Sequence, residues 1–191
     1  MEAQHIYTTA ASSLQQVSKM HCVCLDFDGV LNSVASTIAY HHLRGPSKTI
    51  YSEADRLDPI AIGLLKYLVD ATDAKIIVSS TWRKNYSLQE FVDIFASYGW
   101  KDAPFIGKTG RGGIGTVRGD EIEDWLNTHP EVSNYVIIDD DSDMLPHQLP
   151  HFVNTSGATG FTLVNLCEAL RIFGVPNSDL EAHAYFTKPT V

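Results

Sequence analysis

The sequence has few cysteines, a deficit of positive charge and no long hydrophobic run. Three cysteines in 191 residues cannot pair off completely, so we expect a reducing, cytoplasmic setting rather than a disulfide-stabilised secreted fold. Fourteen Lys and Arg residues against 23 Asp and Glu residues give a net charge of −9. This charge argues against broad binding of duplex nucleic acid or anionic lipid, although it allows a local basic pocket.

The hydrophobic pattern also argues against a membrane partner. The longest mainly apolar stretch, Ile60–Val69, is interrupted by Lys66 and falls short of the roughly 18–20 residues that a membrane span needs. The first residues lack the positive start and apolar block of a secretory signal. We therefore expect a soluble protein.

The chain alternates short apolar runs of β type with helical patterns, which is typical of parallel βαβ units covered on both faces. With 44% hydrophobic residues, the length is enough for one well-filled core. We expect an N-terminal arm over residues 1–19 and a single α/β domain over residues 20–191. The predicted strands are His21–Leu25, Lys75–Val78, Tyr135–Ile138 and, more weakly, His151–Val153.

Helices are predicted from their ends as well as from their periodicity. Asp58 followed by Pro59 is typical of an N-cap with proline at the first helical position. Ile60, Leu64 and Leu68 recur every fourth residue and predict the buried face of that helix. The four predicted helices begin near Asp58, Ser87, Asp120 and Thr162.

Two long segments do not fit this rhythm, residues 32–56 and residues 100–118. Loops of this length in a compact domain are usually functional or disordered. The first segment is too short for a large cap domain, so we expect a flap or small insertion over the site at about residues 32–56. The second segment is rich in glycine but lacks the residue order of a P-loop.

Two carboxylates follow the first predicted strand. Asp26 and Asp28 flank Phe27, and because side chains alternate along an extended chain, both can face one side while Phe27 turns into the apolar layer. Gly29 permits a backbone conformation that a side chain would resist. An Asx-rich turn would account for the same residues.

Four further carboxylates, Asp139, Asp140, Asp141 and Asp143, stand where the third predicted strand ends. Such crowded carboxylates repel and raise one another's pKa unless a cation lies among them. A hard ion with oxygen ligands, such as Mg²⁺, suits this set better than zinc. The alternative is a solvated acidic loop that caps a helix.

The second predicted strand ends in hydroxyl groups and an arginine. Ser79 and Ser80 can donate to phosphoryl oxygens, and Arg83 can hold a phosphate through its two-pronged guanidinium. Alternatively, the hydroxyls satisfy a turn while Trp82 packs and Arg83 lies on the surface. Cys22 and Cys24 lack a second ligand pair at zinc spacing, which favours small buried side chains.

The three strand ends together resemble the haloacid dehalogenase (HAD)-like superfamily of phosphotransferring enzymes. The runs DFDGVLN, SST and DDDSD follow in the superfamily's order, and the resemblance covers roughly Met20 to Phe173. IIVSSTWR, RGDEIEDWL and VIIDDD are most similar to the HAD domain of Swiss-army-knife RNA repair proteins. The resemblance implies a three-layer Rossmann-like α/β fold, with a parallel central sheet flanked by helices and no large cap.

The resemblance also implies a Mg²⁺-dependent phosphohydrolase that acts on phosphomonoesters through an aspartyl phosphate. Asp26 matches the nucleophile, and Asp28 matches the general acid and base. The metal is implied to lie between Asp26, the backbone carbonyl of Asp28 and the acidic run. There Asp139 and Asp143 match the spacing, and Asp140 is a candidate either for a direct ligand or for a group that supports one. The excess of acids, with Asp141 also present, leaves open which carboxylates contact the ion.

Ser79 best matches the hydroxyl that anchors the phosphoryl group, and Ser80 is its rival. Arg118 best matches the lone cation that offsets the charge of the acyl phosphate, with Lys108 as the alternative. The predicted substrate-binding residues are Ser80, Arg83 and Lys108.

Three functions stay open at this stage. The first is a phosphatase acting on a phosphorylated substrate. The second is an end-processing phosphatase that acts on a nucleic acid end and works with separate repair enzymes. The third is a non-catalytic module that binds a phospho-ligand, against which the presence of both Asp26 and Asp28 argues.

Overall fold

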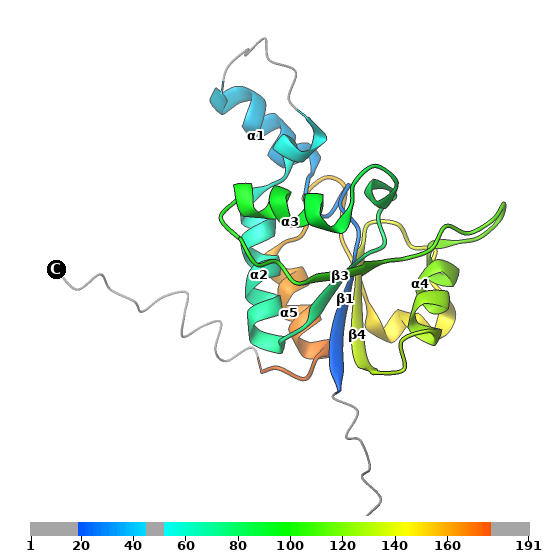
Figure 1. Cartoon of the computed structure of the whole chain (residues 1–191). Helices are drawn as coiled ribbons and strands as arrows, with labels where there is room; N and C mark the ends of the chain where they lie inside the picture. Colours follow the sequence, from blue (N-terminus) through cyan, green and yellow to red (C-terminus); the bar gives the residue numbers. More distant parts are fainter. Residues whose placement is uncertain (1–18, 45–51, 177–191) are drawn as a thin grey trace, which may run out of the picture.

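The computed structural model describes residues 19–44 and 52–176 (Figure 1). Apart from Lys19, the predicted N-terminal arm lies outside the described residues, as do residues 45–51 of the predicted flap and residues 177–191. Within the described ranges, no helix has both the length and the apolar character needed to cross a membrane.

A five-stranded parallel sheet forms the centre of the molecule, with strand order β3-β2-β1-β4-β5. The four predicted strands are confirmed with small shifts of their ends. The fifth, β3, falls in a segment predicted to be a loop, because four residues containing a glycine at a sheet edge give little β signal. The strands are β1 (Met20–Leu25), β2 (Lys75–Val78), β3 (Phe105–Lys108), β4 (Val132–Asp139) and β5 (Phe152–Asn154).

The four predicted helices are confirmed, and a fifth, α1, was not predicted. It occupies the segment where we expected a flap, and it lies beyond the carboxyl ends of the strands (Figure 1). No large cap domain is present among the described residues. The helices are α1 (Val34–Arg44), α2 (Pro59–Thr72), α3 (Leu88–Ser97), α4 (Arg118–Asn127) and α5 (Leu163–Ile172), and the 3₁₀ turns are η1 (Glu53–Arg56), η2 (Thr81–Lys84) and η3 (Pro146–His151).

The helices cover both faces of the sheet, with α2 and α5 on one side and α4 on the other (Figure 1). Alternation along β1 divides its side chains between the two layers. Val23 and Leu25 pack in the large core with α2, α3 and α5. Cys22 and Cys24 pack in the smaller clusters with α4. Both cysteines are fully buried as predicted, and burial raises the pKa of the Cys22 thiol to about 12.

The predicted buried face of α2 is partly wrong. Ile60 is 72% exposed, and of the three expected residues only Leu68 is fully buried. A second apolar stripe, which includes Ala61 and Leu65, overlaps the predicted one on this helix. Packing against the sheet and α5 buries this second stripe. The buried residues of α2 are Ala61, Ile62, Leu65, Leu68 and Val69.

The strand order changes direction between β1 and β4. From β1 the chain proceeds to β2 and β3 on one side and then to β4 and β5 on the other. Such a reversal leaves an opening at the carboxyl ends of the two strands where the direction changes. Leu25 pairs with Ile138, so the residues that follow them, Asp26 and Asp139, emerge side by side at this opening.

Candidate active site

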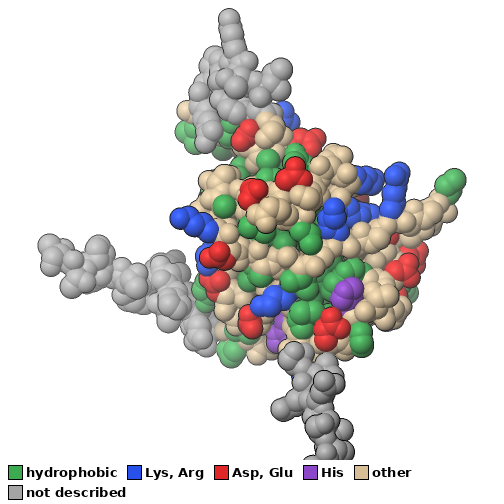
Figure 2. All heavy atoms as spheres, in the orientation of Figure 1, with side chains coloured by type: hydrophobic (Ala, Val, Ile, Leu, Met, Phe, Trp, Pro, Cys, Tyr) green, Lys and Arg blue, Asp and Glu red, His purple; other side chains and the backbone are tan. Residues whose placement is uncertain are grey.

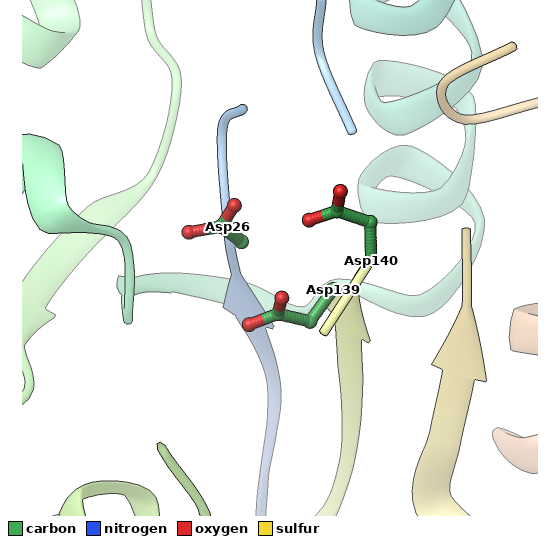
Figure 3. A group of neighbouring side chains, drawn as sticks. All are labelled: Asp26, Asp139 and Asp140. Carbon is green, nitrogen blue, oxygen red and sulfur yellow. The ribbon is translucent and has the colours of Figure 1, made fainter. Parts of the chain in front are cut away.

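Three carboxylates converge at the opening between β1 and β4. Asp26 follows β1, Asp139 is the last residue of β4, and Asp140 comes next (Figure 3). Each offers an oxygen, and these oxygens all lie within 4.8 Å of one another. Asp26 and Asp139 are only 5% and 1% exposed, whereas Asp140 is more accessible to solvent. The structure therefore brings the first and third predicted strand ends together.

Burial destabilises the charged forms of these acids. Loss of solvent is the main factor that raises the pKa of Asp26 to about 6, while the charge of Arg118 and, after it, the neighbouring Ser80 act in the opposite direction. The pKa of Asp139 rises to about 7, first through burial and then through the charge of Asp26. Burial and the charge of Asp141 also raise the pKa of Asp140.

Arg118 is the cation that the fold brings to the acids. It begins α4, and its Nη1 lies 3.4 Å from Asp26 Oδ1 while its Nε lies 3.6 Å from Asp139 Oδ2. Lys108, the predicted alternative, lies at the end of β3, where its Nζ donates to the carbonyl oxygens of Arg83 and Tyr86 at 3.0 Å. The geometry thus favours Arg118 as the charge that balances the carboxylates.

The three carboxylates fit a hard divalent cation. The guanidinium of Arg118 lies near Asp26 and Asp139, so one positive charge stands against a cluster of three carboxylates. Asp139 Oδ2 is buried, and among the described residues it has no hydrogen-bond partner. An all-oxygen ligand set of this kind is what Mg²⁺ prefers.

Asp143 and Asp141 take other positions in the acidic run. Asp143 Oδ2 accepts a hydrogen bond from the backbone N–H of Arg118 at 3.0 Å, and its carbonyl accepts from Gly119. Asp143 therefore caps the start of α4 and lies outside the cluster of three. The backbone N–H of Asp141 donates to Asp139 Oδ1 at 3.0 Å and orients that carboxylate.

Two donors hold Asp28, which lies exposed at the rim. Its Oδ1 accepts from Asn32 Nδ2 and its Oδ2 accepts from Trp82 Nε1, each at 2.8 Å. Phe27 is fully buried between the two aspartates, as predicted. Sequence reasoning missed both donors. A side-chain amide four residues after Asp28 was a local signal for Asn32, whereas nothing local pointed to Trp82.

Gly29 allows the chain to turn away from the site. Its φ of +73° lies in the left-handed region, as its place after the strand predicted. A Cβ at this position would also overlap the Asp140 carboxylate. The carbonyl of Gly29 accepts a hydrogen bond from Thr155 Oγ1 at 2.9 Å, which ties the turn to the segment after β5.

The two serines after β2 differ in their surroundings. Ser80 lies close enough to Asp26 to lower the pKa of that carboxyl, and its hydroxyl accepts from the backbone N–H of Trp82 at 3.3 Å. Ser79 is fully buried, and among the described residues its hydroxyl has no hydrogen-bond partner. The structure therefore places Ser80, rather than Ser79, directly beside Asp26.

Arg83 is engaged with protein groups rather than directed at the opening. Its Nη1 donates to the carbonyl oxygens of Ser79 and Ser80, each at 2.8 Å. Its Nη2 lies 2.6 Å from Glu121 Oε2, and Glu121 also accepts from the backbone N–H of Gly112. The guanidinium thus links η2, α4 and the glycine-rich segment, and the predicted role in phosphate binding finds no support in this geometry.

Comparison with known proteins agrees with the site. The family model described as the HAD domain in Swiss Army Knife RNA repair proteins matches residues 22–166, more than half of the chain. No curated protein matches the sequence. The matched range contains the three converging acids and Arg118, and the parallel sheet flanked by helices is the architecture expected of a Rossmann-like HAD fold. The chain therefore belongs to the family of HAD domains found in Swiss Army Knife RNA repair proteins.

Proposed function

We propose that this phosphatase-like HAD module is a Mg²⁺-dependent phosphomonoester phosphatase that works through an aspartyl phosphate on Asp26. The observation that carries the proposal is the convergence of Asp26, Asp139 and Asp140 with Arg118 at the carboxyl ends of β1 and β4. Buried groups with displaced pKa values beside an oppositely charged residue are typical of catalytic sites.

In the first step, a carboxylate oxygen of Asp26 attacks phosphorus and the bond to the leaving oxygen breaks. Asp28, in its acid form, donates a proton to that oxygen, so the leaving group departs as a neutral alcohol. Arg118 stabilises the negative charge of the phosphoryl oxygens. The hydroxyl of Ser80, beside Asp26, is positioned to donate to one of them.

In the second step, water hydrolyses the acyl phosphate. Asp28, now a carboxylate, takes a proton from water, the water oxygen attacks phosphorus, and the bond to Asp26 breaks to release inorganic phosphate. Asp26, Asp139 and Asp140, together with the backbone carbonyl of Asp28, would hold Mg²⁺. The ion would supply positive charge that keeps these acids ionised and offsets the charge of the phosphoryl group.

The test is hydrolysis of a phosphoester panel of p-nitrophenyl phosphate, sugar phosphates, nucleotides and phosphorylated oligonucleotides, with and without Mg²⁺. We expect turnover that requires Mg²⁺. Rapid acid quenching should trap a phosphoryl adduct on Asp26 that mass spectrometry detects. Asp26→Asn should lower kcat by at least about 1,000-fold and abolish the adduct, because it removes the nucleophile.

A wild-type protein that binds phosphoesters but hydrolyses none of the panel would contradict the proposal and favour a non-catalytic phospho-ligand module. Asp93→Asn is the matched control, because Asp93 lies exposed on α3 and bonds Gln89 of the same helix. Its activity should equal that of the wild type.

A nucleic acid end is the second candidate for the substrate. Lys and Arg side chains gather over η2 and the segment after β3 in an otherwise acidic protein (Figure 2). Lys84 and Arg111 are exposed there. Such a local basic edge suits the phosphates that flank a terminal one. An oligonucleotide with a 3′- or 5′-phosphate should then have a higher kcat/KM than the matching mononucleotide, and the advantage should shrink with added salt.

A further inference from the structure

The indole of Trp82 contacts both Phe27 and Asp28 in the turn that follows β1. Its Nε1 donates to Asp28 Oδ2 at 2.8 Å. Its ring stacks on Phe27, with centroids 5.0 Å apart and an interplanar angle of 27°. Trp82 itself is only 3% exposed. One side chain therefore supports the residue between the two aspartates and holds the second aspartate by its edge.

The turn that carries Trp82 is fixed from several directions. Ser80 caps it through the backbone N–H of Trp82, and Lys108 donates to two carbonyls at its end. Tyr86 packs on the indole with centroids 5.5 Å apart. A ring held in this way points its N–H in one direction, and that direction is toward Asp28.

Asp28 needs such support because it is exposed. An exposed aspartate rotates freely about its side-chain bonds, which lowers the fraction of time that it points at a reacting atom. Here each carboxyl oxygen accepts one hydrogen bond, from Asn32 and from Trp82. Asn32 is oriented in turn by the backbone N–H of Gly29, which donates to its Oδ1 at 3.0 Å. Two fixed donors define the plane of the carboxyl group.

We propose that Trp82 is a positioning residue for proton transfer, one that holds the carboxyl group of Asp28 against the leaving oxygen of the substrate. This inference rests on the proposed function, in which Asp28 is the acid and base. As the phosphorus–oxygen bond breaks, the proton passes from Asp28 to the leaving oxygen, and the carboxylate that remains is stabilised by the indole N–H and by Asn32.

This role predicts a dependence on the leaving group. An alkyl alcohol is a poor leaving group and needs the proton of Asp28, whereas p-nitrophenolate departs readily without one. In Trp82→Phe the aromatic ring that stacks on Phe27 is kept and the N–H is lost. We expect kcat/KM to fall about 10-fold or more for an alkyl phosphate and by less than about 3-fold for p-nitrophenyl phosphate.

Trp100→Phe is the matched control for Trp82→Phe. Trp100 is 5% exposed in the same core and packs on Phe95, so the substitution removes a similar volume. It should change kcat/KM for both substrates by the same small factor. If Trp82→Phe also lowers both values equally, Trp82 has only a structural role and the proposal is wrong.

Nuclear magnetic resonance gives a readout that does not depend on activity. The chain has three tryptophans and hence three indole N–H signals, which Trp→Phe substitutions assign. Asp28→Ala removes both acceptor oxygens and should move the Trp82 signal most. If the wild type is an active phosphatase and Asp28→Ala leaves the Trp82 signal unmoved, the inference about Trp82 is wrong while the proposed function stands. A moved signal in a protein that hydrolyses no phosphoester would instead overturn the proposed function, and the proton-transfer role with it.

Discussion

The carboxyl edge of the sheet has two halves that treat their charged groups differently. On the β1–β4 half, Asp26, Asp139 and Asp140 crowd together, and burial raises the pKa of each. On the β2–β3 half, Arg83 and Lys108 donate to backbone carbonyls at 2.8–3.0 Å, and Arg83 also pairs with Glu121. On the first half, neighbouring negative charges repel one another, whereas on the second half the cations are paired with carbonyl oxygens and a carboxylate.

The difference shows which polar residues are scaffold and which form the site. A cation that binds carbonyls and a carboxylate inside the protein stabilises the fold and has little left for a ligand. A buried carboxylate beside two others costs stability, and such a cost is retained where function needs the group. Residue type alone does not separate the two halves, because Arg83, Lys108 and Arg118 were all predicted to be cations of the site.

Replacing one cation of each half by methionine should give the largest difference between the two halves, in activity for one variant and in stability for the other. Arg118→Met should lower kcat/KM for p-nitrophenyl phosphate about 100-fold, because it removes the charge beside Asp26 and Asp139. Lys108→Met should lower the free energy of unfolding by about 1–2 kcal/mol, through two lost hydrogen bonds, with a smaller effect on activity. Steady-state kinetics and urea unfolding of both variants measure the two effects. A larger loss of activity in Lys108→Met would reverse the comparison.

Two glycines sharpen the contrast between site and scaffold through the backbone. Gly29→Ala should lower the free energy of unfolding by about 1–3 kcal/mol and weaken Mg²⁺ binding, because φ is +73° and a Cβ would displace the Asp140 carboxylate. Gly63 is exposed within α2, and within the described part of the chain no atom outside the helix's own backbone lies near an added Cβ.

Gly63→Ala should therefore stabilise the protein by about 0.5–1 kcal/mol. Urea unfolding and calorimetric titration with Mg²⁺ check both glycine variants. Equal stability of the two would show that the turn after β1 carries no strain.

The conflict among the acids should also appear as a pH dependence of stability without divalent ions. Folding raises the pKa of Asp26 from 3.8 to about 6 and that of Asp139 from 3.8 to about 7. At pH values between the unfolded and the folded pKa of each group, the folded protein therefore binds more protons than the unfolded chain. Stability from these groups therefore falls as pH rises from 4 toward 7. Thermal unfolding in a chelator should show a lower Tm at pH 8 than at pH 5, and Mg²⁺ should raise the Tm at pH 8.

Asp139→Asn tests the origin of this effect. Because it removes one of the mutually repelling negative charges, it should flatten the pH dependence. It should also raise the Tm in chelator at pH 8, by roughly 2–4 °C for each kcal/mol gained in the free energy of unfolding. It should also reduce the stabilisation by Mg²⁺. An unchanged pH dependence would place the destabilising charge elsewhere than in the cluster.

Local patterns were enough to predict four of the five strands and the strand ends at which Asp26, Asp139 and Asp140 converge. The alternation around Phe27 places it inside and the aspartates at the strand end, and crowded carboxylates after a buried strand favour a nearby cation, although Asp143 of the same run caps α4 instead. The edge strand β3 and helix α1 were missed. β3 has four residues and contains a glycine, and α1 has no acidic residue in its first turn to mark where the helix begins. The buried face of α2 was also predicted wrongly, because the sequence of this helix allows two overlapping apolar faces.

The sequence by itself determined the parallel α/β fold, the order of the strand ends and the aspartates on them, because these depend on residues that are neighbours in the chain. Only the tertiary structure decided that Arg118 faces the acids while Arg83 and Lys108 turn inward, and that Trp82 reaches Asp28. Those choices depend on distances between side chains far apart in sequence, 54 positions in the last pair, and the packing of η2 and α4 against the sheet sets such distances.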